Sequence, residues 1–269
     1  MNEEYLDLRE PIAWRDDAER RAAIKFFNAA FRAEESGLTQ AHQLAGEVRG
    51  WDPDLARVLE LYGDEEGWHR ELLTQFLEYI GGAVLPMGRV TRVLYRLYGR
   101  AKRMESIVLT NLMFETIGSV TYRLALRRVS HPSARQMLTI LTRDEAFHVP
   151  LNVHFLRQIL ERRSSAERRR LRKLYLGLFL TLSLLPIASR PKARQFDQIP
   201  LTELMRAYAE HLARLFSREQ DLGLVPPGWL LSLFGVDAAA LASDDDLIST
   251  SIEAAEKAAE REQVAVRAL

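Results

Sequence analysis

One pattern of glutamate and histidine residues occurs twice in this chain of 269 residues. Each copy has a single glutamate, followed roughly 30 residues later by a Glu-x-x-His motif. The copies consist of Glu34, Glu66 and His69, and of Glu115, Glu145 and His148. Pro53 precedes Glu66 by the same thirteen residues by which Pro132 precedes Glu145. The chain therefore looks like a duplicated helical hairpin, and we expect its two halves to face each other.

Apolar residues recur at helical spacing through most of the chain, with few strand-like alternations, which predicts an all-α fold. The expected helices cover residues 17–48, 53–80, 88–100, 102–129, 132–163, 165–186, 200–218 and 245–265. The four long helices within residues 1–163 would form a four-helix bundle. Residues 164–269 would add C-terminal helices, packed on the bundle as part of the same domain or as a helical extension. With 47% apolar residues, the chain can build a substantial core.

The repeated pattern is that of a carboxylate-bridged dimetal centre inside a four-helix bundle. In a helix, Glu-x-x-His places both side chains on one face, because residues three apart are neighbours. The candidate ligands, which would also be the catalytic residues, are Glu34, Glu66, His69, Glu115, Glu145 and His148. This oxygen-rich set suits iron or manganese better than zinc. Two Fe(II) ions would neutralise the four carboxylates, which lowers the cost of burying them.

Neighbouring residues leave several alternatives open. Glu34 lies nearer than Glu35 to the centre of the apolar stripe on its helix, so we favour Glu34 as the ligand. Glu65 and Asp144 each stand four residues before a motif histidine, where a carboxylate could orient an imidazole through its second nitrogen. Both could equally be surface charges. Tyr122 shares the face of Glu115 and is read as a core aromatic, with a redox or hydrogen-bonding role as the alternative. The remaining candidates for metal ligation, His42, His154 and His211, fall outside the pattern.

Composition excludes several classes of site. The chain has no cysteine, so disulfides, thiolate metal sites and iron–sulfur clusters are ruled out, which fits a reducing cytoplasm. Lys plus Arg and Asp plus Glu number 37 each, so no overall charge favours nucleic acid. The first residues lack the apolar segment of a signal peptide. Residues 162–194 nevertheless carry ten basic residues against one acidic residue, a net charge of +9.

Within this basic region, residues 174–188 are almost entirely apolar. Fifteen residues are too few to cross a bilayer, and we expect Pro186 to end the helix. A buried helix that covers the bundle is the favoured interpretation. The alternatives are a peripheral membrane contact, with the flanking arginines on anionic headgroups, and a channel lining for a hydrophobic substrate.

Over residues 20–163 the sequence resembles the ferritin-like di-iron superfamily, through Glu34, the Glu66 and Glu145 motifs, and Glu115. The wider layout is similar to that of aldehyde-deformylating oxygenases, in which a C-terminal cluster of helices follows similar motifs. The resemblance implies two iron ions, with a manganese–iron pair left open. It also implies that Glu66 and Glu145 bridge the metals, while Glu34, Glu115, His69 and His148 each bind one.

The leading hypothesis is a cytoplasmic non-haem di-iron oxygenase or oxidase that uses O2 to oxidise a small hydrophobic organic substrate. Its electrons would come from an external reductase or ferredoxin-like carrier, because the chain shows no flavin or nicotinamide motif. A homodimer is compatible with the sequence. One alternative is a ferroxidase or peroxide scavenger with iron itself as substrate. Another is a non-enzymatic helical protein of the membrane surface, or of some other interaction, whose metal site is structural or vestigial.

Overall fold

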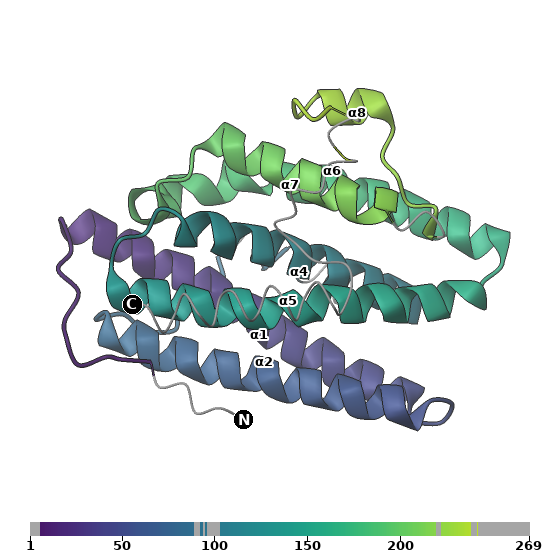
Figure 1. The fold of residues 1–269 in the computed structure, drawn as a ribbon, viewed down its shortest axis with the longest axis horizontal. Helices are drawn as coiled ribbons and strands as arrows, with labels where there is room; N and C mark the ends of the chain where they lie inside the picture. Colours follow the sequence, from purple (N-terminus) through teal and green to yellow (C-terminus); the bar gives the residue numbers. More distant parts are fainter. Residues whose placement is uncertain are drawn as a thin grey trace.

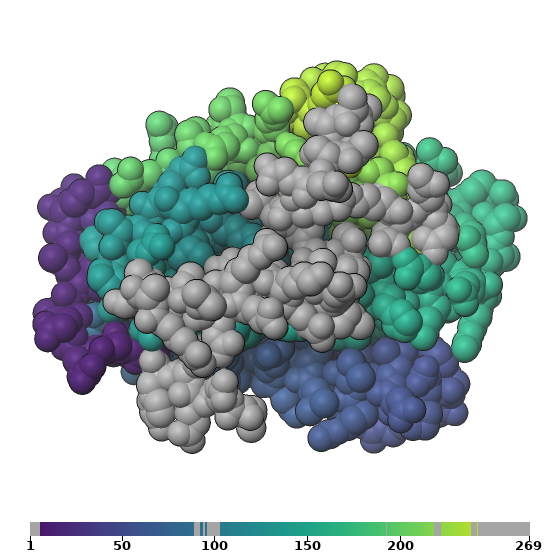
Figure 2. Space-filling view, in the orientation of Figure 1, coloured from purple at the N-terminus to yellow at the C-terminus, as the bar shows by residue number. Residues whose placement is uncertain are grey.

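The computed structural model describes residues 6–88, 92–93, 95, 103–218, 222–237 and 241. The regular elements assigned within these residues are all helices, so the expected all-α class is confirmed (Figure 1). The expected helix at 88–100 lies largely outside the described residues, and the one at 245–265 lies wholly outside them. The space-filling view places α2 at one edge of the molecule and α8 at the opposite edge (Figure 2).

The first hairpin consists of α1 (Asp17–Val48) and α2 (Pro53–Tyr79), which pack along each other. Both helices begin where an aspartate can cap them. The side chain of Asp16 accepts a hydrogen bond from the Glu19 backbone N–H at 2.8 Å, and Asp52 does the same for Leu55 at 2.9 Å. Pro53 occupies the first helical turn, where its missing N–H costs nothing. These local signals explain why both boundaries agree with the sequence-based prediction.

The second hairpin consists of α4 (Met104–Leu126) and α5 (Pro132–Glu161). Pro132 begins α5 as Pro53 begins α2, so the repeat seen in the sequence is also a repeat of helices. The two hairpins meet through contacts of α1 with α4 and of α2 with α5. This arrangement brings the repeated motifs toward a shared interior.

Two further helices, α6 (Ser165–Asp197) and α7 (Leu201–Arg218), lie over the hairpins (Figure 1). Helix α6 packs on α1 and α4, and α7 packs on α4 and α6. The short helix α8 (Gly228–Ser232) begins directly after Pro227 and contacts α7. Buried apolar residues of all these elements form a single core, so α6, α7 and α8 belong to the same packed unit as the hairpins.

The expectation that Pro186 ends its helix was wrong. Helix α6 runs to Asp197, with Pro186 and Pro191 in its interior. A proline inside a helix removes one hydrogen bond and costs about 3 kcal/mol. Burial of one side of α6, including Tyr175, Phe179 and Leu182, offsets this cost. By length and hydropathy, Ser165–Pro191 is the one described helical segment that could cross a bilayer, and 39% of its most apolar window is buried.

A buried ion pair secures the C-terminal end of α6. The Arg190 guanidinium donates to both carboxylate oxygens of Asp197 and, at 2.8 Å, to the backbone carbonyl of Ile199. Asp197 also accepts from the Ile199 backbone N–H at 3.0 Å. Both charged side chains are shielded from water, so each depends on the other for compensation. The pair thereby holds the chain where it leaves α6 for α7.

We expect Arg190→Ala to lower the free energy of unfolding by about 3–5 kcal/mol, because it leaves the Asp197 carboxylate buried without a partner. Urea denaturation followed by circular dichroism would measure the change. Arg194→Ala is the matched control, since Arg194 is exposed one turn further along α6, and it should change stability by less than about 0.5 kcal/mol. Equal effects of the two substitutions would contradict the structural role of the ion pair.

Candidate metal centre

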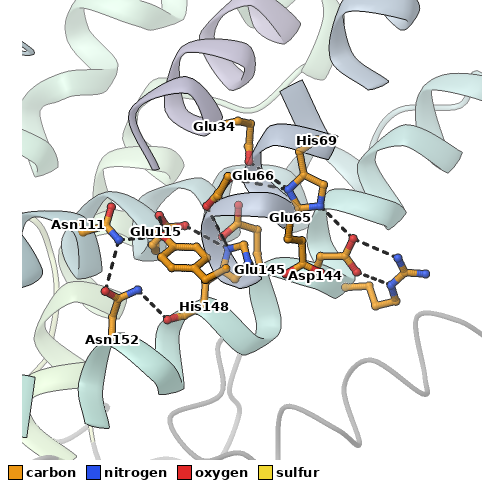
Figure 3. A network of polar contacts seen from close by, with 12 residues as sticks. Glu34, Glu65, Glu66, His69, Asn111, Glu115, Asp144, Glu145, His148 and Asn152 are labelled. Carbon is orange, nitrogen blue, oxygen red and sulfur yellow. Dashed lines mark hydrogen bonds and ion pairs between the residues drawn. The ribbon is translucent and has the colours of Figure 1, made fainter. Parts of the chain in front are cut away.

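The six residues of the repeated pattern converge in the interior of the molecule (Figure 3). Glu34 comes from α1, Glu115 from α4, and each Glu-x-x-His motif from α2 or α5. Five of the six residues are at most 3% exposed, and the Glu115 side chain is 10% exposed. Four helices thus direct four carboxylates and two imidazoles to one buried place.

The side chains form two neighbouring groups of potential ligand atoms. In the first, one atom each from Glu66, Glu115, Glu145 and His148 lie within 4.8 Å of one another. In the second, atoms of Glu34, Glu66 and His69 meet the same limit. Glu66 belongs to both groups. Each group could hold one cation, and Glu66 lies between the two groups.

Several atoms at the centre of this cluster are buried without a hydrogen-bond partner. They are both carboxylate oxygens of Glu66, Oε2 of Glu145 and Nδ1 of His148. The His148 Nδ1 atom lies 3.3 Å from Glu145 Oε2 and 3.4 Å from Glu66 Oε1. Leaving such atoms unpaired away from water costs about 1–3 kcal/mol each. Because these atoms face one another, bound cations would satisfy them together.

Carboxylates outside the cluster orient the two imidazoles, and the pairing is crossed between the motifs. His69 Nε2 lies 2.9 Å from Asp144 Oδ2, and His148 Nε2 lies 3.0 Å from Glu65 Oε2. Each histidine is therefore held by the acid that precedes the other motif, on the facing helix (Figure 3). A proton on Nε2 that is shared with a carboxylate leaves the lone pair of Nδ1 directed at the cluster, as metal coordination requires.

The two crossed pairs differ in their exposure. Asp144 is buried, and the Arg143 guanidinium contacts its carboxylate at 2.5 and 3.0 Å. The Glu65 side chain is 42% exposed. The pair at His69 is thus enclosed by protein, whereas the pair at His148 reaches the solvent.

Tyrosines hold the two single glutamates. The Tyr122 hydroxyl donates to Glu34 Oε1 at 2.9 Å, so Tyr122 is a hydrogen-bond donor to the cluster as well as a core aromatic. The Tyr62 hydroxyl donates to Glu115 Oε1 at 2.7 Å and accepts from the side-chain amide of Asn111 at 2.8 Å. Each single glutamate therefore has one oxygen fixed from outside the cluster.

The sequence reasoning missed Tyr62, Asn111 and Asn152, which extend this network. Asn152 accepts from Asn111 at 3.3 Å and donates to the His148 backbone carbonyl at 2.9 Å. Each missed residue stands four positions from a pattern residue on the same helix, a spacing that places two side chains on one face. A search for polar residues at that spacing would have found them.

A glycine makes room for the shared carboxylate. A Cβ atom built on Gly37 of α1 would lie 2.7 Å from Glu66 Oε1, closer than real Cβ contacts allow. Gly118 holds the equivalent position after Glu115, where the nearest atom to a Cβ would be Tyr122 Cε2 at 4.0 Å. Only the first glycine of this repeated pair is therefore required by the packing around the cluster.

Without cations, the cluster retains protons. Burial and the charge of Glu34 raise the pKa of Glu66 well above its usual value, and burial and the charge of Glu115 raise the pKa of Glu145. Burial also works against the charge of Glu34, but its contacts with Glu66, His69 and Tyr122 outweigh this effect and lower the pKa of Glu34 to about 2.

Burial opposes the charged form of both histidines, yet their acidic neighbours raise both pKa values well above 6.5. For His69 the next largest cause is the hydrogen bond with Asp144, and for His148 it is the charge of Glu145. The acidic neighbours thus favour the protonated forms of these imidazoles, and binding of cations would release such protons.

Residues considered as alternative ligands lie elsewhere. Glu35 is paired with Arg32 at 2.5 Å on the outer side of α1. His42 faces Asp64 at 3.5 Å, and His154 contacts Gln158 at 3.0 Å, both at partly or fully exposed positions. His211 is buried in α7. None of them joins the two groups described above.

His211 should make stability depend on pH. Burial, and then the charges of Arg214, Arg123 and Arg127, lower its pKa to about 3 in the folded chain. The unfolded chain takes up this proton below about pH 6.5 and the folded chain does not, so stability is lost as the pH falls. We expect this residue to account for a loss of about 2 kcal/mol between pH 7.5 and pH 5.

Urea denaturation at the two pH values would measure this loss. His211→Leu should remove it, whereas His154→Leu, at an exposed position, should leave it unchanged. A loss of the same size in His211→Leu and in the unaltered protein would contradict the assignment.

Comparison with known proteins finds no family model that matches this chain and no curated protein with significant sequence similarity. The case for a function therefore rests on the cluster itself.

Proposed function

We propose that this protein is a ferritin-like di-iron oxidoreductase, an oxygenase or oxidase that uses O2 to oxidise a hydrophobic organic substrate. The observation that carries the proposal is the position of Glu66. Its two buried oxygens have no hydrogen-bond partner, and they lie between two groups of carboxylate and imidazole atoms. A bridging carboxylate between two cations needs this arrangement, and a purely structural polar contact does not.

The ligand set fits a pair of divalent iron ions. Glu115, Glu145, His148 and one oxygen of Glu66 would hold one ion, and Glu34, His69 and the other oxygen of Glu66 would hold its neighbour. Bridging by Glu145 as well stays a prediction, since its atoms group with one site only. Four carboxylates would balance the charge of two divalent ions, so the loaded cluster could remain buried. Manganese favours the same hard ligands, and a mixed pair is compatible with them.

When bound, the iron pair would supply the redox chemistry toward O2. The residues of the chain would supply geometry and a dry environment. Tyr62 and Tyr122 fix one oxygen of each single glutamate. The other oxygen faces Nδ1 of a motif histidine, at 3.2 Å for Glu34 and His69 and at 3.7 Å for Glu115 and His148, so both atoms could bind the same ion. Asp144 and Glu65 keep the protons of the histidines on Nε2, away from the metal side. The core around the cluster is apolar and shields it from water, which favours a hydrophobic substrate over a polar one.

Metal analysis combined with anaerobic reduction tests the proposal. Protein grown in iron-rich medium should contain two iron ions per chain, and after reduction it should consume O2 with a change in its visible absorption spectrum. Glu115→Ala should lose the tight binding of two ions, because it removes one ligand and leaves the Tyr62 hydroxyl without its acceptor. Full occupancy by two ions in that variant would refute the assignment.

The same experiment separates the alternatives. O2 consumption that continues with every addition of Fe(II), without an organic substrate, would identify iron itself as the substrate, as in a ferroxidase. The exposed carboxylate of Glu65, next to His148, supports the ferroxidase alternative because it offers incoming cations a first contact. An iron-loaded protein that shows no spectral change in air would instead indicate a structural or vestigial site.

A further inference from the structure

Helix α6 presents two different faces. One face is packed into the core and includes Leu171, Tyr175, Leu178, Phe179 and Leu182. The opposite face carries three apolar side chains in contact with solvent, Leu180 (41% exposed), Leu184 (38%) and Ile187 (53%). At 3.6 residues per turn these three fall within a sector of about 60°. The favoured expectation of a buried helix therefore holds for only one side of α6.

Exposed cations stand at both ends of this apolar strip. Arg169 and Lys173 precede it in nearly the same angular sector, and Arg194 follows it. Residues 168–196 contain no aspartate or glutamate that could neutralise these charges. We call the set formed by Arg169, Lys173, Leu180, Leu184, Ile187 and Arg194 the outer face of α6.

The charges of this face argue for one kind of partner. A second copy of the chain, docked by the same face, would bring cations against cations in either helix orientation, because the face has no acidic residue. An anionic phospholipid surface complements both features, since its headgroups attract the cations and its acyl boundary accepts the apolar strip. We therefore propose that the outer face of α6 docks this protein on an anionic membrane surface.

Helix α6 would lie in the plane of the membrane and would not cross it. Crossing would expose the packed face, and the buried ion pair of Arg190 and Asp197 would have to leave the core. Such a withdrawal is far more costly than contact with one face. Docking through the outer face leaves the core and the cluster as they are.

Helix α8 lies at the same edge of the molecule as α6 and α7 (Figure 1), and it also carries exposed apolar residues. Trp229 is 67% exposed and Leu233 is 69% exposed, one helical turn apart. The next residue, Phe234, packs edge-on against Phe179 of α6 at 6.0 Å between ring centroids. Tryptophan is favoured at membrane–water interfaces, so Trp229 is suited to report contact with lipid.

Flotation of the full-length protein with vesicles tests the proposal. The protein should float with phosphatidylcholine vesicles that contain about 30% phosphatidylglycerol, because their surface is strongly negative. It should remain behind with pure phosphatidylcholine, and 0.5 M salt should release it. The double change Arg169→Glu and Lys173→Glu should weaken binding by at least about 25-fold, at roughly fivefold per cation. Trp229 fluorescence, isolated by comparison with Trp229→Phe, should shift to shorter wavelength on binding.

Two single variants separate insertion into lipid from simple attraction to a polyanion. Leu180→Glu should weaken vesicle binding by about tenfold or more, because it places a charge in the apolar strip. Leu61→Glu, on the outer side of α2 and 51% exposed, is the matched control and should bind like the unaltered protein. Equal binding by the Leu180 and Leu61 variants would overturn the proposal, as would an unaltered protein that fails to float. A dimer in solution that Leu180→Glu dissociates would also overturn it, because a second copy would then occupy the face.

Discussion

Glu66→Gln should make the metal-free protein more stable while abolishing its stabilisation by iron. In the folded chain the Glu66 carboxyl is buried without a hydrogen-bond partner, and burial and the charge of Glu34 raise its pKa. The protonated carboxyl therefore contributes to the free energy of unfolding. This contribution is complete below pH 4.5 and is lost as the pH rises through the raised pKa. A neutral amide removes that loss, so we expect a gain of about 1–3 kcal/mol at neutral pH.

The measurement is thermal unfolding with and without Fe(II) under anaerobic conditions. The unaltered protein should unfold at a higher temperature when Fe(II) is present, because a ligand that binds only the folded state stabilises it. In Glu66→Gln this increase should vanish, since the residue shared by both groups of ligand atoms can no longer bridge. Glu71→Gln, at an exposed position of the same helix, should keep the increase. If Glu66→Gln still gained stability from iron, Glu66 would not be the bridging ligand.

Gly37→Ala should leave the fold almost unchanged and yet lower the iron content below two ions per chain. The new methyl group would lie 2.7 Å from Glu66 Oε1, so one of the two must move. The end of a flexible side chain moves more readily than a helix, and we therefore expect the carboxylate to swing out of its place in the cluster. Because alanine favours helix by up to about 1 kcal/mol over glycine, the stability of the metal-free protein should hardly fall.

The internal repeat provides the control for this prediction. Gly118→Ala makes the same chemical change at the equivalent position of α4, where the nearest atom would be 4.0 Å away. It should bind two ions and gain about 0.5–1 kcal/mol in stability from helix propensity. Iron analysis and urea denaturation of both variants would decide the matter. Two bound ions in Gly37→Ala would mean that the space at Gly37 does not set the position of Glu66.

Much of the architecture followed from local signals in the sequence. Asp16, Asp52 and the prolines at 53 and 132 mark helix starts by chemistry that acts within one turn, so the starts of α1, α2 and α5 could be predicted. The choice of Glu34 over Glu35 for the interior position followed from helical phase and from the repeated spacing to Gly37 and Gly118, and the structure places Glu34 in the cluster. Helical phase works here because one face of each helix is buried.

Features that depend on contacts between distant segments could not be predicted in this way. Pro186 was expected to end α6, but packing of the helix against α1 and α4 and the ion pair beyond it outweigh the local preference. The crossed pairing of His69 with Asp144 also depends on how two helices face each other. The spacing within one motif gives no information about which residues of two helices face each other. For the same reason it does not reveal that the Tyr62 hydroxyl hydrogen-bonds to Glu115.

The crossed pairing has a consequence for how such a site can arise. Because the acid before each motif serves the histidine of the other, neither hairpin alone contains a complete imidazole environment. In a symmetric dimer of one ancestral hairpin, the twofold axis would place the acid of each subunit against the histidine of the other. Gene duplication and fusion would then preserve the exchange inside one polypeptide and would let the two halves diverge. In this chain the two acids differ in exposure, since Asp144 is enclosed and Glu65 faces the solvent.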